Sequence, residues 1–236
     1  MRFVRSLILA AAALGSLPAY AQSADDDLRR FAVSIINVPP FAMPFSGYGI
    51  YLGESAIIAP AHVVGHWSVF ANLKVIIAGR EIPAKVIKKG LFPQLDLAQL
   101  SIEQASLPDS LRLRRNPLCK ESPRVGTNVV VVNPERTQHY RIISPLAIAP
   151  QFRSQFGTLI SEPQMSGSSV YNADKRCLLG IMSASVARYD PPNVVGLYDF
   201  MSESVKQLDF QRRAGRMGYF VPAAAITEFL PAHYRF

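Results

Sequence analysis

Three residues, in chain order His62, Asp96 and Ser166, carry side chains that together could perform acyl transfer. His62 lies in the run APAHVV, Asp96 in LDLA and Ser166 in MSGSSV. Each run marks a place where a strand-like pattern ends in a turn, so each side chain could be presented at a strand end. A general base, a carboxylate that orients it and a hydroxyl nucleophile are what acyl transfer by serine requires. The three runs therefore predict a serine-nucleophile site.

Each run also has an ordinary structural explanation. A single histidine in an apolar stretch is most often a packed or surface residue, and an aspartate or a Ser-Gly-Ser-Ser segment is typical of a turn. Order and spacing favour chemistry, because the base and the acid fall in the first half of the chain and the nucleophile in the second. One half of the fold would then donate the base and the acid, and the other half the nucleophile.

Strand patterns dominate both halves of the chain. Short runs rich in Val, Ile, Tyr and Phe are separated by Gly, Pro, Asn and Ser. The first half contains such runs at 31–36, 49–52, 56–59, 73–77, 82–87 and 97–100. The second half contains them at 128–132, 140–143, 158–160, 169–171, 178–182 and 220–221. We therefore expect an all-β protein.

Two non-strand segments and a helix complete the pattern. Residues 106–123 are rich in Pro, Arg and Asp, which indicates a linker between two halves. The segment 187–217 has no periodicity that defines its structure, and long connections of this kind are often functional loops. Pro222 opens a run that predicts a helix over about 222–230, because proline fits the first helical turn.

The N-terminal residues have the features of an export signal. Arg2 and Arg5 precede the apolar run 7–14, and Ala19-Tyr20-Ala21 fits the small-x-small pattern of a cleavage site. We expect cleavage after Ala21, leaving a mature chain of 22–236 in the periplasm or outside the cell. A membrane anchor is the alternative, but the apolar run is shorter than the roughly 20 residues that a spanning helix needs.

Composition excludes several classes of function. The formal net charge of +8 is mild, and the densest basic stretch, 112–124, has no interleaved aromatic residues, so we expect no nucleic-acid partner. A polyanion-binding structural protein is an interpretation that rests on charge alone. The four histidines are not at ligand spacing, so we expect no metal and no cofactor. Nothing in the sequence defines an oligomeric state.

Cys119 and Cys177 are the only cysteines in the chain. An exported protein meets an oxidising compartment, which permits a disulfide between them. Two separate free thiols are the alternative. We predict the disulfide, which would stabilise the fold by about 4 kcal/mol in the chain-entropy model.

These runs together resemble the chymotrypsin-fold, or trypsin-like, serine proteases, and within them the bacterial HtrA-type and glutamyl-endopeptidase-like branches. The resemblance covers almost all of the mature chain and rests on segments 47–50, 57–64, 95–100, 166–172 and 218–222. It implies two six-stranded antiparallel β-barrels with a short C-terminal helix. The N-terminal barrel would span about 30–105, the linker about 106–123, the C-terminal barrel about 124–222 and the helix about 222–230. No PDZ-like domain is expected after Phe236.

The resemblance also assigns roles within a polypeptide-cleaving site. Ser166 would attack the peptide carbonyl, His62 would act as general base and then acid, and Asp96 would hold the imidazole. The amides of Gln164 and Ser166 would form the oxyanion hole. An uncharged substrate pocket with small polar walls would be lined by Ile160, Ser161, Ser183 and Ser185. Ser183 also matches the position where the family often has a small polar residue near the acid, although it could be an ordinary strand serine.

One position departs from the family pattern. Gln164 stands where the family normally has glycine, whose amide must turn inward to the oxyanion. A non-glycine residue held in strained backbone costs about 1–3 kcal/mol, and losing one oxyanion donor costs about 2.7–4 kcal/mol of barrier. Met165 stands where digestive members have an aspartate, so zymogen activation of that kind is not expected. The alternative function is a catalytically silent barrel that binds a protein or cell-envelope partner.

Overall fold

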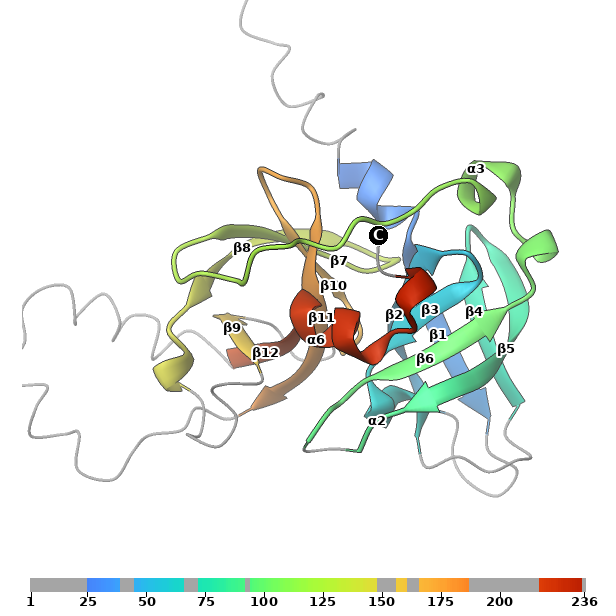
Figure 1. Ribbon diagram of the computed structural model, residues 1–236, viewed down its shortest axis with the longest axis horizontal. Helices are drawn as coiled ribbons and strands as arrows, with labels where there is room; N and C mark the ends of the chain where they lie inside the picture. The colour runs from blue at the N-terminus through green and yellow to red at the C-terminus, as the bar shows by residue number, and fades with distance from the viewer. Residues whose placement is uncertain are drawn as a thin grey trace, which may run out of the picture.

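The computed structural model describes residues 25–38, 45–65, 72–91, 94–147, 156–160, 166–186 and 217–234. Its strands form two closed barrels that lie side by side (Figure 1). The strand order is β1-β2-β3-β6-β5-β4 in the first barrel and β10-β11-β12-β9-β8-β7 in the second. All neighbouring strands are antiparallel, which confirms the predicted all-β architecture. The predicted leader 1–21 and the segment 187–216 lie outside the described residues.

The first barrel is built from short strands joined by tight turns. Its strands are β1 Ala32–Val38, β2 Phe45–Gly53, β3 Ala56–Ala59, β4 Asn72–Ile77, β5 Arg80–Lys89 and β6 Ala98–Ile102. Glu54 and Ser55, between β2 and β3, have φ of 49° and 74°. Positive φ at both central residues is typical of a type I′ hairpin turn, whose twist matches the strands that it joins.

The second barrel comprises β7 Asn128–Val132, β8 Thr137–Ile143, β9 Gly157–Ile160, β10 Ser169–Asn172, β11 Leu178–Val186 and β12 Met217–Pro222. The valine run of β7 does not alternate with polar residues, because its side chains pack on both faces of the strand. Val130 and Val132 belong to the large core that continues into the first barrel, whereas Val129 and Val131 belong to a second cluster with Phe220. Both faces of β7 are therefore buried, and one core spans both barrels.

Short helices connect and cover the barrels. They are α2 Ala61–Val64, α3 Asp109–Arg112 and α6 Ala223–Phe229, with single 3-10 turns at η1 Gln104–Ser106, η2 Pro145–Ala147 and η4 Ala232–Tyr234. The C-terminal helix predicted at 222–230 is α6, with Pro222 preceding it as the N-cap. α6 lies over the junction of the two barrels (Figure 1), where the Lys88 ammonium donates to the Phe229 carbonyl at 2.9 Å.

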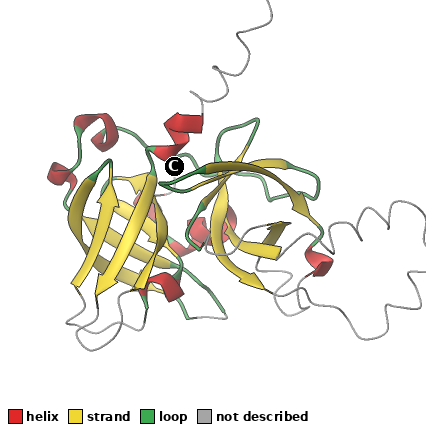
Figure 2. Ribbon diagram, turned by 180° about the vertical axis from the view of Figure 1, so that it is seen from behind, coloured by secondary structure: helices red, strands yellow, loops and turns green. Residues whose placement is uncertain are grey.

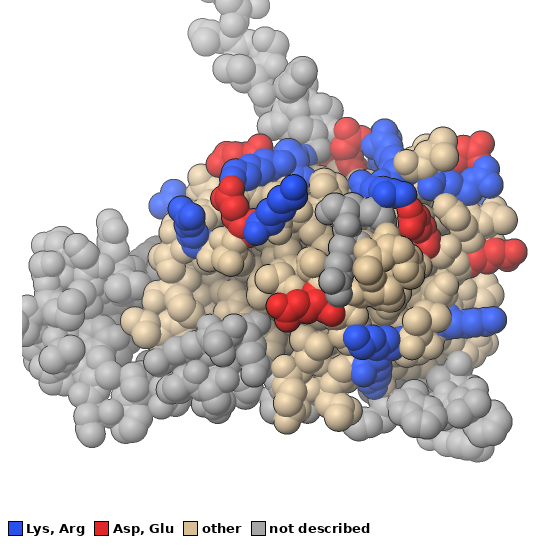
Figure 3. Space-filling view, in the orientation of Figure 1, with Lys and Arg blue, Asp and Glu red and all other residues tan. Residues whose placement is uncertain are grey.

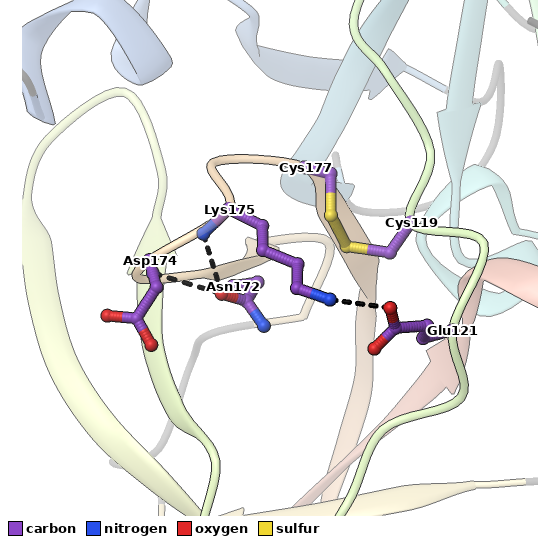
Figure 4. The surroundings of a disulfide bond; sticks show 6 residues. All are labelled: Cys119, Glu121, Asn172, Asp174, Lys175 and Cys177. Carbon is purple, nitrogen blue, oxygen red and sulfur yellow. Dashed lines mark hydrogen bonds and ion pairs between the residues drawn. A yellow bond between two sulfur atoms is a disulfide. The ribbon is translucent and has the colours of Figure 1, made fainter.

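The segment between the barrels contacts both of them. The Asn116 backbone N–H donates to the Leu52 carbonyl at 3.0 Å, and its side-chain amide donates to the Tyr171 hydroxyl at 2.7 Å. Cys119 and Cys177 form a disulfide with a Cα–Cα distance of 5.0 Å (Figure 4). The disulfide fastens this segment to the turn between β10 and β11.

Three arginines of this segment are paired with acids. Ion pairs join Arg112 to Asp109, Arg114 to Asp27 and Arg115 to Glu54. Lys and Arg side chains accordingly alternate with Asp and Glu over the same part of the surface (Figure 3). The positive charge that the sequence concentrates at 112–124 is thus partly neutralised in the fold.

A helical turn at 25–29 also lies across the barrel junction in both views of the ribbon (Figures 1 and 2). The Asp25 carboxylate accepts from Arg176 at 2.7 Å and contacts the His139 ring at 2.9 Å, both on the second barrel. Leu28 and Phe31 pack in the core that spans both barrels. The N-terminal turn and the C-terminal α6 therefore both hold the barrels in one arrangement.

Candidate active site

His62 is presented by α2, the single helical turn that follows β3. Strand β3 is buried throughout, and Pro60 ends it because proline has no N–H to donate to a sheet. Val63 and Val64 are buried beneath the turn. The His62 side chain remains 41% exposed at the barrel junction. The local sequence thus fixes the histidine backbone while leaving the ring accessible.

Asp96 lies just before β6 and is completely buried. Its Oδ2 contacts His62 Nδ1 at 2.8 Å, and its Oδ1 accepts from the His62 backbone N–H at 3.0 Å. The Ser183 hydroxyl, from the second barrel, also donates to Oδ2. The carboxylate therefore fixes the ring and backbone of His62 and is itself held by both barrels.

The electrostatics of this pair keep the carboxylate ionised. Burial by itself raises the pKa of Asp96, but the hydrogen bond and charge of His62, with the Ser183 hydroxyl, outweigh it and hold the pKa below its ordinary value. An ionised carboxylate only accepts hydrogen bonds, so His62 Nδ1 carries the proton that points to Asp96. The Nε2 atom is then the free acceptor that a general base needs.

Ser183 reaches Asp96 because of a β-bulge. The pairing of β11 with β12 shifts register between Met182 and Ala184, which leaves Ser183 as the extra residue. Bulges re-aim side chains and occur next to active sites. The Ser183 side chain is fully buried against Asp96, so any contribution of this residue to a substrate pocket comes from its backbone.

Ser166 lies in the turn that leads into β10 and is half-buried. Its carbonyl accepts from the Tyr48 N–H of β2 at 3.1 Å, and the Gly167 N–H donates to the Met182 carbonyl of β11 at 2.7 Å. Burial, with the neighbouring Glu135 carboxylate, raises the pKa of Tyr48 to about 12, so this tyrosine is neutral at physiological pH. The serine turn is thus held between the two barrels.

Two series of contacts bring this turn to the His62–Asp96 pair. Tyr48 follows Gly47, which packs so closely on Val63 that a Cβ at Gly47 would lie 2.6 Å from Val63 Cγ1. Met182, which bonds Gly167, precedes Ser183, which bonds Asp96. These contacts connect the serine turn to the segments that carry His62 and Asp96. Within the described residues no hydrogen bond joins Ser166 to His62, and in unliganded sites this bond is often long until substrate binds.

The remaining predicted site residues are only partly placed. Gln164 and Ser161 lie outside the described residues, as does Met165. Ile160 and Ser185 are described as backbone on β9 and β11, which flank β12 on opposite sides. Their assignment to a substrate pocket stays a prediction.

The residues that hold the serine turn have no recognisable pattern in the sequence. Tyr48 acts through its backbone N–H, which any residue type except proline would supply. Asn133, whose side chain donates to the buried Ser168 hydroxyl at 3.4 Å, looks in the sequence like an ordinary turn residue. Such contacts arise from tertiary folding and carry no local pattern.

We expect Gly167→Ala to destabilise the fold and abolish any activity at Ser166. Gly167 has φ of +88°, and a Cβ there would lie 1.7 Å from the Tyr48 carbonyl oxygen. The free energy of unfolding should fall by more than about 1 kcal/mol in chemical denaturation.

Gly126→Ala is the matched control for this prediction. Gly126 has φ of +86°, but a Cβ there would meet nothing within 4 Å, so this position carries the backbone strain without the clash. Equal losses in the two variants would show that contact with Tyr48 does not fix the serine turn.

Neither a metal centre nor a membrane-spanning helix accompanies this cluster in the part of the chain that the structure describes. Among those residues, no three His, Cys, Asp or Glu side chains gather as a metal centre. None of the helices described there is long and apolar enough to cross a membrane.

No protein-family model and no curated protein matches this sequence. Solved structures do match. The active form of the Rv3671c protease from M. tuberculosis superposes with a TM-score of 0.60 at 17% identity, over 98% of this chain and 92% of that chain. The HtrA-type protease AlgW, solved with a tripeptide, gives 0.61 at 16% identity over 88% of this chain.

The serine endoprotease from Yersinia pestis gives a TM-score of 0.57 at 18% identity over 88% of this chain. This chain spans 61% of the AlgW chain and 64% of the Yersinia chain. At these identities the likeness establishes the fold. The chain has the chymotrypsin-like fold of HtrA-type serine proteases, as the sequence predicted.

Proposed function

We propose that this protein is an exported serine endopeptidase that cleaves peptide bonds through Ser166, His62 and Asp96. The observation that carries the proposal is the buried Asp96 carboxylate, which receives the ring and backbone of one histidine and a hydroxyl from the opposite barrel. Burying a charged carboxylate costs free energy, and the three donors offset this cost. Such an arrangement suits an acid that must hold a histidine in one orientation. The shared fold with serine proteases supports the same conclusion.

The chemistry follows from these positions. His62 Nε2 takes the proton of the Ser166 hydroxyl as its oxygen attacks the substrate carbonyl, and the carbonyl electron pair moves to the oxygen. Backbone amides of Ser166 and Gln164 would stabilise this oxyanion. Collapse of the intermediate expels the amine, which takes the proton from His62, and leaves an acyl ester on Ser166. Water then repeats the steps and frees the serine.

Location outside the cytoplasm belongs to the same proposal. The leader-like residues 1–21 predict export, and the Cys119–Cys177 disulfide suits an oxidising compartment. We therefore place the enzyme in the periplasm or outside the cell, acting on polypeptides there.

The decisive experiment is covalent labelling of the purified chain 22–236 with a fluorophosphonate probe. The wild type should gain one adduct by intact mass, and peptide mapping should locate it at Ser166. Ser166→Ala should remain folded and unlabelled, while Ser122→Ala, at an exposed serine of the linker, should label like the wild type. A folded wild type that never labels would favour the binding-barrel alternative.

A further inference from the structure

The helical turn that carries His62 is capped at its C-terminal end by side chains from two other strands. A one-turn helix leaves its last carbonyls without partners in the helix. The buried Asn37 side chain of β1 donates to the Val64 carbonyl at 2.6 Å. The Lys89 ammonium, at the end of β5, donates to the Gly65 carbonyl. Both contacts fix the end of α2 that lies just beyond the histidine.

Lys89 is also placed directly against the segment that carries Asp96. Lys89 pairs with Ala98 in the β5–β6 ladder, and the Gly90 N–H donates to the Leu97 carbonyl at 2.7 Å. Gly90 packs so tightly that a Cβ there would lie 2.3 Å from the Leu95 carbonyl oxygen. The backbone of Lys89 is therefore fixed beside the acid while its side chain reaches the turn of the base.

The Lys89 ammonium also lies in the field of the acid. Partial burial lowers the pKa of Lys89, while the Asp96 carboxylate acts in the opposite direction and favours the ammonium. The cation that donates to the end of the histidine turn is therefore held near the carboxylate that binds the histidine.

We propose that Lys89 is a positioning residue of the candidate active site, which fixes the turn that presents His62 through its hydrogen bond to the Gly65 carbonyl. The inference rests on the proposed function. No sequence pattern singles out Lys89, because the run KVIKK is typical of a solvated strand.

The test measures kcat and KM for an unstructured polypeptide in the wild type, three variants of Lys89 and one control variant. Lys89→Met removes the donor to the Gly65 carbonyl, so kcat should fall about tenfold with little change in KM. Lys89→Gln and Lys89→Arg each retain a donor for this carbonyl, so both should keep most of the wild-type kcat.

Lys85→Met is the matched control, because Lys85 is exposed on the same strand and its loss changes the net charge equally. It should leave kcat and KM unchanged. A wild-type kcat in Lys89→Met would overturn the inference, and so would an equal loss of kcat in Lys89→Met and Lys89→Arg. A wild type without activity or fluorophosphonate labelling would instead overturn the proposed function.

Discussion

Replacing Asp96 with Asn should lower kcat about 10⁴-fold while leaving the protein folded. The amide cannot act as the ionised acceptor that holds the proton on His62 Nδ1, so the ring would settle in the tautomer that presents no free acceptor to Ser166. The measurement is steady-state hydrolysis of an unstructured substrate such as casein. Far-ultraviolet circular dichroism would establish that the barrels remain intact.

Asp109→Asn is a suitable control for the loss of an acid. Asp109 is exposed and pairs with Arg112 at the surface, so its removal should leave turnover unchanged. Ser183→Ala should fall between the two, because it removes one donor to the Asp96 carboxylate and leaves both His62 contacts. Unchanged turnover in Asp96→Asn would mean that another carboxylate, such as Asp199 or Glu162, orients the base.

Asp96→Asn should also change how the free energy of unfolding depends on pH in acid. Because the pKa of Asp96 is held below its unfolded value of about 4, the ionised group contributes stability that is complete above that pH. This contribution is lost as the pH falls through the lower folded-state pKa. Asp96→Asn has no such carboxylate, so its stability should decline less steeply below about pH 4 than that of the wild type.

The strands could be predicted from the sequence because burial imposes a period on them. In β4 the buried positions alternate with half-exposed ones, and this alternation is visible as LKVII in the sequence. Strand β5 extends to Lys89, beyond the predicted 82–87, because its last residues are lysines whose ladder bonds leave no hydrophobic signal. The helical turns η1 and α3 were not predicted, since three or four residues are too few to show a helical period.

The candidate site, like the fold, could be predicted only in part from the sequence. His62, Asp96 and Ser166 could be proposed from the sequence because their order along the chain matches the order in which two barrels would present them. The contacts that hold them could not be found so directly. Lys89 reaches the Gly65 carbonyl across strands, so its contact depends on register and closure of the barrel. The family resemblance does place Ser183 near the acid, but the bulge that aims its hydroxyl at Asp96 has no sequence pattern. Gly167 is the exception, because a glycine after a nucleophilic serine signals a tight turn.

Replacing Gln164 with Gly should raise the rate of casein hydrolysis by about 10²- to 10³-fold, the value of one oxyanion donor. Downstream of the nucleophile the backbone is fixed, because Tyr48 binds the Ser166 carbonyl and Met182 binds the Gly167 N–H. The conformational freedom that could admit a second amide to the oxyanion must therefore come from positions before Ser166. Glycine at 164 removes the side-chain strain that opposes an inward-turned amide.

Met165→Gly is the matched control, since it adds the same backbone freedom at the neighbouring position without changing the residue whose amide is in question. It should not raise the rate, and Gln164→Gly combined with Ser166→Ala should be inert. A folded Gln164→Gly protein with wild-type activity would show that residue 164 does not limit the oxyanion hole. If Gln164→Gly and the wild type were both folded and both inert toward casein and toward a fluorophosphonate, the barrel would be a binding module. Asp96 would then serve only to hold His62 and to join the two barrels through Ser183.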